Sequence, residues 1–472
     1  MPTASSDLSQ FKGSLQGQLI TSHDGDYEEA RTVWNGMIDK RPELIVRCMD
    51  SSDVINAVNF ARAKHLLTAI RGGGHNVAGF GTCDGGMVID LSPMKDISVD
   101  AASRTARAEA GLTWGEFDKA TQARGLATTG GLVSGTGIAG FTLGGGFGWL
   151  VRKHGLTIDN LLSVEMILAD GRSVTASTNE NADLFWGVRG AGGNFGIVTS
   201  FTFRLHPVGP MVFGGAVFHP AERARDLLRF YRGWTQTLPD ELSSMVVFLT
   251  AQPEPFVPRR LVGTPMIAIA LCHAGAVDAG EKLVRPLREF APPAIDRLGP
   301  LPYLALQALF NQSAPKGIHA YWGTQYLRDL DDATIDALID RTSAMKSLSP
   351  YSAVHIHHWE GAVKRAAADQ SAFGDRSAPY VLNILGLWTP GKDAGEHINW
   401  VRTFSDALQS RGTGHVYLNF LADEGADRVK AAYDAQTFER LRQLKAKFDP
   451  RNFFRVNQNI SPADDESRQK SL

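Results

Sequence analysis

The chain has 472 residues, 43% of them hydrophobic and 21% charged, and at roughly 150 residues per domain this length predicts two to four domains or one large composite fold. Its 48 Lys and Arg residues nearly balance 50 Asp and Glu residues, and this net charge of −2 excludes a protein that holds nucleic acid by its phosphates. No stretch reaches the ~20 apolar residues that span a bilayer, and the N-terminus lacks a basic start before an apolar block. We therefore expect a cytoplasmic protein without a membrane partner. Three distant cysteines, Cys48, Cys83 and Cys272, predict reduced thiols rather than disulfides.

The first two hundred residues alternate between predicted strands and helices. Residues 44–49 and 66–70 are short apolar runs, and between them Asp53 is placed to cap a helix with apolar residues at helical spacing. This strand, helix and strand have the size of a βαβ unit, which predicts parallel strands. The elements expected next are strands at 87–91 and 105–110, a helix at 114–124, a hairpin of 162–169 with 172–176, a helix at 181–188, and a strand from 201 that stops at His206-Pro207.

The composition changes after residue 207. Glycine becomes rarer, prolines cluster at 252–258 and 292–302, and helical windows alternate with strand-like runs. The helical windows are 221–232, 332–346 and 394–409, and the strand-like runs are 265–271, 353–359 and 380–388. This pattern predicts an α+β domain with a largely antiparallel sheet. A strand at 416–421 and an amphipathic helix at 437–448 are expected near the C-terminus.

Glycine is concentrated in three segments. Arg71-Gly-Gly-Gly-His75-Asn76 follows a predicted strand, and its backbone N–H groups can turn into a nest for an anionic or planar ligand. The alternative is a glycine-rich loop with a surface histidine. Nine of the nineteen residues from Gly130 to Gly148 are glycine, and a third segment runs from Arg189 to Gly196. The motif Gly135-Thr-Gly-Ile-Ala-Gly140 lacks the preceding strand and following helix of a Rossmann site. Three such segments suit one long, extended ligand.

These segments resemble a known family. The stretches RGGGHN (71–76), GTGIAGFTLGGGFGWL, HGLTIDN (154–160), LFWGVRGAGGNFGIVT (184–199), YLNF (417–420) and KFDPRNFFRVNQNI (447–460) are similar to FAD-linked oxidases of the vanillyl-alcohol oxidase superfamily, in its berberine bridge enzyme-like branch. The resemblance covers about residues 40–206 and 415–460. It implies an α+β fold in which residues 1–207 and 411–472 form a two-part FAD-binding domain of the PCMH type. Residues 208–410 are then the inserted substrate-binding domain, an antiparallel sheet flanked by helices.

The resemblance also implies a set of cofactor residues. His75 occupies the position whose ring nitrogen is joined to the 8α-methyl group of the flavin, and the alternative is a histidine that only packs beside FAD. Many relatives add a cysteine tether, but that position is Val133 here, so a single link is expected. The remaining contacts implied by the resemblance are Arg71, Gly72, Gly73, Gly74, Asn76, Gly79, Gly135, Thr136, Gly137, Gly140, Gly144, Asp159, Asn194, Gly196, Ile197, Asn457 and Asn459.

Three residues are candidates for catalysis by the same resemblance. Tyr417 corresponds to a tyrosine placed over the flavin, and Asn419, two residues on, shares its face of the predicted strand. A phenol needs a cationic or hydrogen-bonded neighbour to act as a base, and His415 is the expected cation. The alternative is a tyrosine that only shapes the pocket. His154 stands where relatives often carry tyrosine and is the third candidate.

A histidine cluster allows a further interpretation. His355 and His357 would share one face of a strand, with Glu360 nearby, as metal ligands do. No clear third ligand follows, so we expect no metal and favour a polar wall of the substrate cavity. Tyr321, Trp322 and Trp359 line the cavity or pack in the core, and Phe373 and Arg376 resemble a structural element of the family.

The expected activity is oxidation of a small organic substrate at an alcohol or amine carbon, with covalently bound FAD reoxidised by O2 to give H2O2. The alternatives are a dehydrogenase with another electron acceptor and a non-catalytic metabolite-binding protein that keeps FAD. The expected partners are the substrate and O2, and the protein is a monomer or homodimer.

Overall fold

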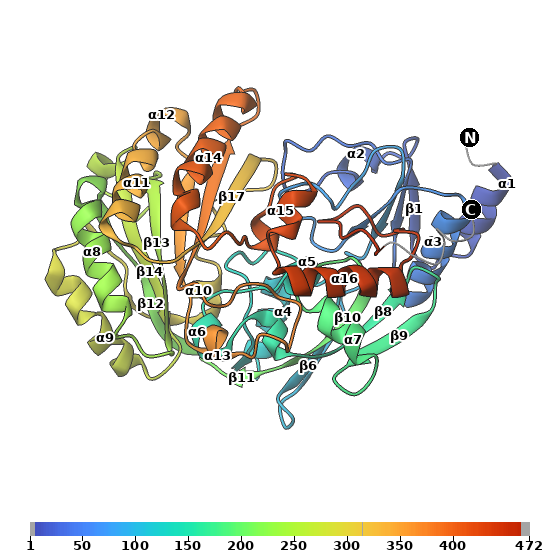
Figure 1. Cartoon of the computed structure of the whole chain (residues 1–472), viewed down its shortest axis with the longest axis horizontal. Coiled ribbons are helices and arrows are strands. Elements are labelled where there is room, and N and C mark those ends of the chain that lie inside the picture. The colour runs from blue at the N-terminus through green and yellow to red at the C-terminus, as the bar shows by residue number, and fades with distance from the viewer. Residues whose placement is uncertain (1–4, 314, 464–472) are drawn as a thin grey trace.

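The computed structural model describes residues 5–313 and 315–463. Within these residues the chain forms sheets of four, five and eight strands and one two-stranded ribbon. Figure 1 shows the eight-stranded sheet and its helices at one end of the molecule and the two smaller sheets at the other. In the described part of the chain, no helix has the length and apolarity needed to cross a membrane.

The first sheet has the strand order β1-β2-β4-β3. Its elements are β1 (Gln18–Thr21), β2 (Leu44–Arg47), β3 (Thr68–Arg71) and β4 (Met87–Asp90), with the helices α1 (Ser5–Gly13), α2 (Tyr27–Ala30) and α3 (Ser51–Ala63). The predicted strands β2 and β3 are parallel, but β4 lies between them and pairs with both. The expected helix cap was wrong: Asp50 caps α3 by accepting from the Ser52 and Asp53 amides. Asp53 is buried and accepts from the Gln16, Gly17 and Met49 amides instead.

The second sheet is antiparallel, with the order β5-β6-β10-β8-β9. Its elements are β5 (Ile97–Asp100), β6 (Thr105–Glu109), β8 (Leu161–Leu168), β9 (Ser173–Ser177) and β10 (Gly196–Arg204), with α4 (Trp114–Gln122), α5 (Ile138–Leu143), α6 (Val151–His154) and α7 (Ala182–Val188). The predicted hairpin is β8 with β9, and its turn uses Gly171 at a positive φ of 85°. The two-stranded ribbon pairs β7 (Leu126–Ala127) with β11 (His206–Pro207). After β11 the chain enters the third sheet.

The eight-stranded sheet is antiparallel throughout, with the order β15-β12-β14-β13-β18-β19-β17 and β16 beside β12. Its strands are β12 (Met211–Pro220), β13 (Leu242–Thr250), β14 (Pro265–His273), β15 (Ile295–Asp296), β16 (Gly299–Pro302), β17 (His319–Leu327), β18 (Ala353–His358) and β19 (Tyr380–Trp388). The helices are α8 (Ala224–Thr235), α9 (Val277–Phe290), α10 (Tyr303–Gln307), α11 (Asp332–Thr342), α12 (Met345–Leu348), α13 (Ala362–Arg365) and α14 (Ala394–Leu408). In Figure 1 the helices α8, α9, α11 and α14 lie on the outer side of this sheet. The predicted α+β class, with a PCMH-type flavin fold and antiparallel sheets, is confirmed, whereas the residue boundaries of the domains stay a prediction.

The C-terminal segment returns to the smaller sheets. Its helices are α15 (Ala426–Lys430) and α16 (Ala435–Phe448), and α16 packs on α7. The buried Lys445 ammonium donates to the Asp449 carboxylate at 2.7 Å and to the carbonyls of Asn194 and Phe454, which ties this segment to the third glycine segment. The predicted strand at 416–421 was wrong: Leu418–Phe420 is a 3-10 turn. In this turn the Asn419 side chain donates to the Phe141 carbonyl of α5, and the Phe420 ring packs on Trp322 of β17.

Candidate active site

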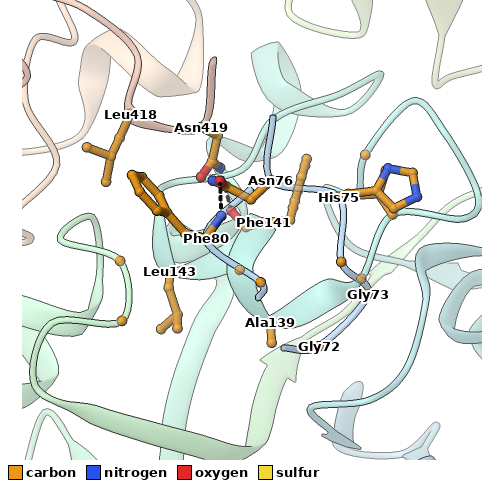
Figure 2. Close-up of a pocket in the computed structure, with 18 of the residues that line it drawn as sticks. Gly72, Gly73, His75, Asn76, Phe80, Ala139, Phe141, Leu143, Leu418 and Asn419 are labelled. Carbon is orange, nitrogen blue, oxygen red and sulfur yellow. Dashed lines mark hydrogen bonds between the residues drawn. The ribbon is translucent and has the colours of Figure 1, made fainter. Parts of the chain in front are cut away.

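A cavity of about 340 Å³ lies where the glycine segments, the C-terminal segment and the eight-stranded sheet meet. Its size falls within the range of small-molecule sites, roughly 300 to 1,000 Å³. Figure 2 shows the side formed by the glycine segments, α5 and the 418–419 turn. The predicted site residues that line the cavity are Arg71, Gly72, Gly73, Gly74, His75, Asn76, Thr136, Gly137, Gly140, Asn194, Gly196, Ile197, Tyr417, Asn419 and Asn457.

The glycine segments meet backbone to backbone. A Cβ on Gly73 would overlap the amide nitrogen of Gly137, so only glycine allows the first two segments to touch. At Gly140 and Gly193, by contrast, an added Cβ would meet nothing within 4 Å, although both residues line the cavity. The amides of residues 73–76 donate no hydrogen bond to any described residue. This cradle fits an extended ligand such as FAD, which would lie against the backbone and accept hydrogen bonds from it.

His75 faces the cavity beside Trp34. The two rings stack with centroids 5.6 Å apart and an interplanar angle of 17°, and a Cβ on Gly135 would lie 3.4 Å from the His75 Nε2 atom. Burial, with the positive charge of Lys316 as a smaller cause, lowers the pKa of His75 to about 4. The imidazole is therefore neutral, and so nucleophilic, at neutral pH.

The contribution of Trp34 and Asn35 was missed from the sequence. Asn35 is fully buried, and its amide donates to the carbonyls of Val77 at 2.8 Å and Ala320 at 2.9 Å. Its Oδ1 atom accepts from the Ala320 amide at 3.0 Å. The segment thus holds the loop after His75 against the start of β17. In the sequence this segment is marked only by a Trp-Asn pair in a stretch without hydrophobic periodicity. Its role could not be predicted, because the partners of Asn35 are distant in the chain.

Tyr417 and Asn419 form a hydrogen-bonded pair under α5. The Asn419 amide donates to the Phe141 carbonyl at 2.9 Å and to the Tyr417 hydroxyl at 3.0 Å, and the Gly146 amide also donates to that hydroxyl at 3.0 Å. Burial raises the pKa of Tyr417 well above its usual value, although these two donors act in the opposite direction. The expected cation does not contact it: the His415 ring lies against the Ala431 carbonyl at 3.2 Å. Residues 415–417 form no strand, and the His415 ring is bonded elsewhere, so the strand-face argument for His415 fails.

Several predicted residues do not line the cavity. His154, the last residue of α6, stacks on His206 with centroids 3.7 Å apart and does not line the cavity, so the catalytic role suggested for it has no geometric support. Asp159 forms a buried ion pair with Arg376 at 2.7 Å and orders its own turn. The remaining predicted residues outside the lining are Gly79, Gly135, Gly144 and Asn459. Gly79 makes room for Ile38 and Gly144 for Asn419, so these glycines serve packing within the protein.

Polar side chains on the cofactor side mostly brace the glycine segments. The Arg71 guanidinium donates to the buried Asp90 carboxylate at 2.8 Å. Asn194 donates to the Ala191 and Gln458 carbonyls and accepts from the Ile460 amide, and Asn457 donates to the Gly193 carbonyl. A ligand in this half of the cavity therefore meets mainly backbone.

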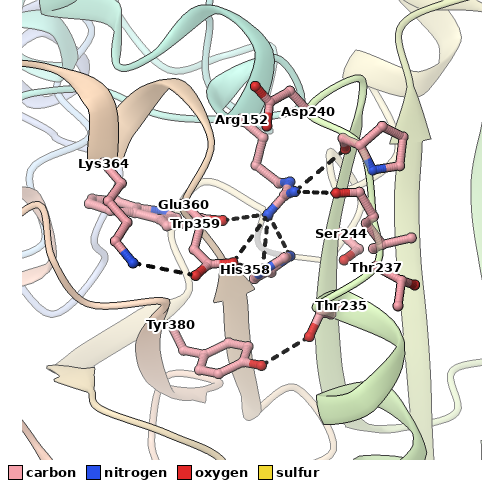
Figure 3. Close-up of polar contacts among 12 residues, drawn as sticks. Arg152, Thr235, Thr237, Asp240, Ser244, His358, Trp359, Glu360, Lys364 and Tyr380 are labelled. Atoms are coloured by element: carbon pink, nitrogen blue, oxygen red, sulfur yellow. Dashed lines mark hydrogen bonds and ion pairs between the residues drawn. The ribbon is translucent and has the colours of Figure 1, made fainter.

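The histidine cluster is divided by the pleat of β18. His355 and His357 line the cavity, whereas His358 points to the other face. There an Arg152 guanidinium nitrogen lies 3.0 Å from His358 Nε2 and donates to the Trp359 carbonyl at 2.8 Å (Figure 3). Glu360 belongs to this second cluster, 3.2 Å from His358. Among the described residues no group of three or more His, Cys, Asp or Glu is arranged to hold a metal ion.

Comparison with known proteins places these features in a family. Residues 42–177 match the FAD binding domain family, and residues 416–461 match the berberine and berberine like family. An FAD-linked oxidoreductase of Dictyostelium discoideum is 32% identical over 460 residues, which covers 96% of this chain and 97% of that protein. The (R)-6-hydroxynicotine oxidase of Paenarthrobacter nicotinovorans is 28% identical over 463 residues, covering 95% and 97% of the two chains. The crystal structure of 6-hydroxy-D-nicotine oxidase from Arthrobacter nicotinovorans has a TM-score of 0.85 at 26% identity, over 95% of this chain and 99% of that one.

The glycine-rich stretches 71–76 and 130–148 lie within the FAD binding domain match, and Tyr417 and Asn419 lie within the berberine and berberine like match. The resemblance inferred from the sequence motifs is confirmed. The chain belongs to the FAD-linked oxidoreductases of the berberine bridge enzyme-like branch and is an FAD-dependent enzyme.

Proposed function

We propose that the protein is an oxidase that removes a hydride from an alcohol or amine carbon of a small organic substrate. An alcohol would lose the hydrogens of its carbinol C–H and O–H bonds and become a carbonyl compound, while one O2 is reduced to one H2O2. When bound, FAD accepts the hydride and passes both electrons to O2. The observation that supports the proposal is that Tyr417, whose hydroxyl accepts hydrogen bonds from the Asn419 and Gly146 amides, is among the residues that line the cavity formed by the glycine segments.

The proton that leaves the substrate hydroxyl is assigned to the Tyr417 oxygen in its phenolate form, after the phenol has lost its own proton to solvent. The Asn419 amide and the Gly146 amide both donate to that oxygen, so they stabilise it when it carries negative charge. The rings of Phe147 and Phe420 pack against the Tyr417 ring at 5.1 and 4.8 Å, which fixes its direction and excludes water. Proton transfer to a positioned side chain contributes about 10² to 10⁴-fold to a rate.

His75 is assigned as the covalent attachment point. Its neutral imidazole is a nucleophile, and joining a ring nitrogen to the 8α-methyl carbon removes two protons and two electrons, which O2 accepts as H2O2. Cys48, Cys83 and Cys272 are buried, and none of them lines the cavity. The side chain at the second tether position, Val133, lines the cavity without a thiol. We therefore assign a single covalent link, between His75 and the flavin.

Two measurements test this proposal. FAD-loaded protein is reduced with dithionite without air and then mixed with aerated buffer. An oxidase reoxidises within seconds and releases one H2O2 per flavin, whereas reoxidation over many minutes would support the dehydrogenase alternative. One observation favours the non-catalytic alternative, namely that no described cationic side chain contacts Tyr417. Flavin bleaching by at least one compound of an alcohol and amine panel separates an enzyme from that alternative.

A further inference from the structure

The cavity wall opposite the glycine segments is made by three neighbouring strands. Asn383 of β19 lies directly opposite His355 of β18, and Leu385 lies opposite Trp322 of β17. Because side chains two residues apart share a face, these residues and His357 project from one face of the sheet. We call the set Trp322, His355, His357 and Asn383 the sheet wall; all four line the cavity.

The sheet wall carries polar atoms without partners. Asn383 and His357 are 2% and 6% exposed, and the atoms Asn383 Oδ1, His357 Nε2 and Trp322 Nε1 have no hydrogen-bond partner among the described residues. A buried polar atom without a partner costs free energy, so these atoms are placed to bond a ligand. They offer one acceptor, one donor and one imidazole nitrogen that can be either.

The sheet wall also carries no charge at neutral pH. Among the lining residues that the structure describes, Arg71 is the single Asp, Glu, Lys or Arg, and it is paired with Asp90 on the cofactor side. Burial lowers the pKa of His355 to about 4 and also holds the pKa of His357 well below its usual value, so both imidazoles are neutral at neutral pH. An ammonium or carboxylate bound here would lose its hydration without gaining a counter-charge, which is strongly unfavourable.

The rest of the space between the sheet wall and Tyr417 is apolar. Phe147 lies 4.8 Å from His357 and 5.1 Å from Tyr417 by ring centroids, so it bridges the two sides. The other apolar residues of this region of the lining are Leu132, Phe310, Leu385 and Phe420. Aromatic walls favour a planar ring by offset or edge contacts. The sheet wall offers three buried polar atoms without partners, fewer than a disaccharide has hydroxyls, and each hydroxyl needs a partner when it is buried.

We infer that the substrate is an uncharged, ring-containing alcohol whose further hydroxyl or carbonyl groups bond Asn383, His357 and Trp322. The inference rests on the proposed oxidase function and narrows it, because it excludes ammonium, carboxylate and sugar substrates. Asn383 is then a specificity-determining residue.

The test uses four probes that differ in charge and polarity. They are 3-hydroxybenzyl alcohol, which is neutral, 3-(aminomethyl)benzyl alcohol, which is a cation, 3-(hydroxymethyl)benzoate, which is an anion, and cellobiose. Dissociation constants are read by calorimetry and from changes in the visible spectrum of the FAD-loaded protein. We expect the neutral probe to bind at least tenfold more tightly than either charged probe, and cellobiose not to bind.

The variant Asn383→Asp places a carboxylate of nearly the same shape in the sheet wall. This variant is expected to weaken binding of the neutral probe about tenfold and to bind the ammonium probe more tightly than the other three. Asn399→Asp makes the same charge change on the exposed surface of α14 and is expected to leave all four constants unchanged. The wild-type comparison requires no variant, so the inference is tested even where Asn383→Asp does not fold.

Equal affinity for a charged and the neutral probe would overturn the inference, and so would failure of the neutral probe to bind. Reoxidation of dithionite-reduced protein by air does not depend on the sheet wall. Fast reoxidation together with a wrong charge preference therefore refutes this inference alone. Slow reoxidation with the expected preference refutes only the oxidase proposal.

Discussion

The glycine segments and the sheet wall face each other across one cavity, but they present different atoms to it. On the glycine side the lining is mainly backbone, and the side chains of Arg71 and Asn194 are bonded within the protein. On the sheet side the polar atoms of Asn383 and His357 are side-chain atoms without partners. A backbone cradle can change little without losing its shape, whereas side chains on a rigid sheet can be exchanged singly. This division lets one fold keep a cofactor while its substrate changes.

The largest effect is expected from a substitution that removes the one imidazole on the glycine side of the cavity. In His75→Ala, acid-stable flavin should fall from nearly all of the protein to none, because no cysteine lines the cavity and its other histidines lie on the sheet wall. FAD should still bind through the backbone cradle. Absorbance near the flavin maximum in the acid pellet and in the supernatant checks both statements. A yellow pellet from the variant would place the link elsewhere.

The next effect concerns the tyrosine between the two sides. Tyr417→Phe keeps the ring that packs on Phe147 and removes only the hydroxyl, so flavin content should not change. The rate of anaerobic flavin reduction by the best alcohol should fall by about 10² to 10⁴-fold. Because burial raises the pKa of Tyr417, the wild-type rate should increase with pH through the alkaline range, and the variant rate should not.

Tyr433→Phe is the matched control for that measurement. Tyr433 is also buried and loses one hydrogen bond, to the Gly190 carbonyl, but it does not line the cavity. Removal of the Tyr433 hydroxyl should lower the free energy of unfolding by about 1 kcal/mol and leave the rate of flavin reduction unchanged. A loss of rate in both variants would assign the effect to packing rather than to the proton transfer.

A third change tests whether the cradle depends on contact between backbones. In Gly137→Ala the new Cβ would overlap the Gly73 amide, and we expect a loss of about 2 to 3 kcal/mol in the free energy of unfolding, with reduced FAD content. Gly233→Ala, in the interior of α8 with open space around it, should instead stabilise the protein by about 0.5 to 1 kcal/mol. Urea unfolding of both variants measures the contrast. Equal effects would mean that the segments do not need close contact.

The same contrast explains what the sequence could reveal. The glycine segments and the β8–β9 hairpin at Gly171 were predictable because their signals are local, a run of glycines or a turn residue between alternating strands. Asn383 and Asn35 were not, because their significance depends on neighbours in distant strands and loops. The spacing of Tyr417 and Asn419 imitates a strand, yet contacts with Phe141 and Gly146 fold the segment into a turn. His154 stands at a family position where relatives often carry tyrosine, but a position in a motif does not fix which side of a helix faces the cavity.

A fourth prediction examines the neutral sheet wall. Because burial lowers the pKa of His355 to about 4, the His355 imidazole is protonated between pH 6.5 and 4 in the unfolded protein but not in the folded protein. The contribution of neutral His355 to the free energy of unfolding is fully present above pH 6.5. It falls by about 1.4 kcal/mol per pH unit as the pH drops towards 4. His355→Gln should remove that contribution, so its stability should fall less steeply over this range than that of the wild type. Parallel curves would show that His355 is charged in the folded protein.

The smallest effect concerns the ring that covers His75. Trp34→Leu removes the stacked indole and exposes the imidazole, which should move the pKa of His75 from about 4 back towards 6.5. At pH 6 the neutral fraction would then drop to about a quarter, so apo-protein should attach FAD about fourfold more slowly. At pH 8 the rates should agree, because the imidazole is neutral in both proteins.

The Trp34 measurement separates two roles that the geometry allows. Trp34→Phe keeps an aromatic ring beside His75 and should retain most of the wild-type rate at pH 6. If Trp34→Leu slows attachment equally at pH 6 and pH 8, the indole acts by orienting the imidazole rather than by keeping it neutral. If neither variant slows attachment of FAD, the backbone cradle positions His75 without help from the stacked indole. The cofactor side of the cavity would then depend on backbone contacts alone.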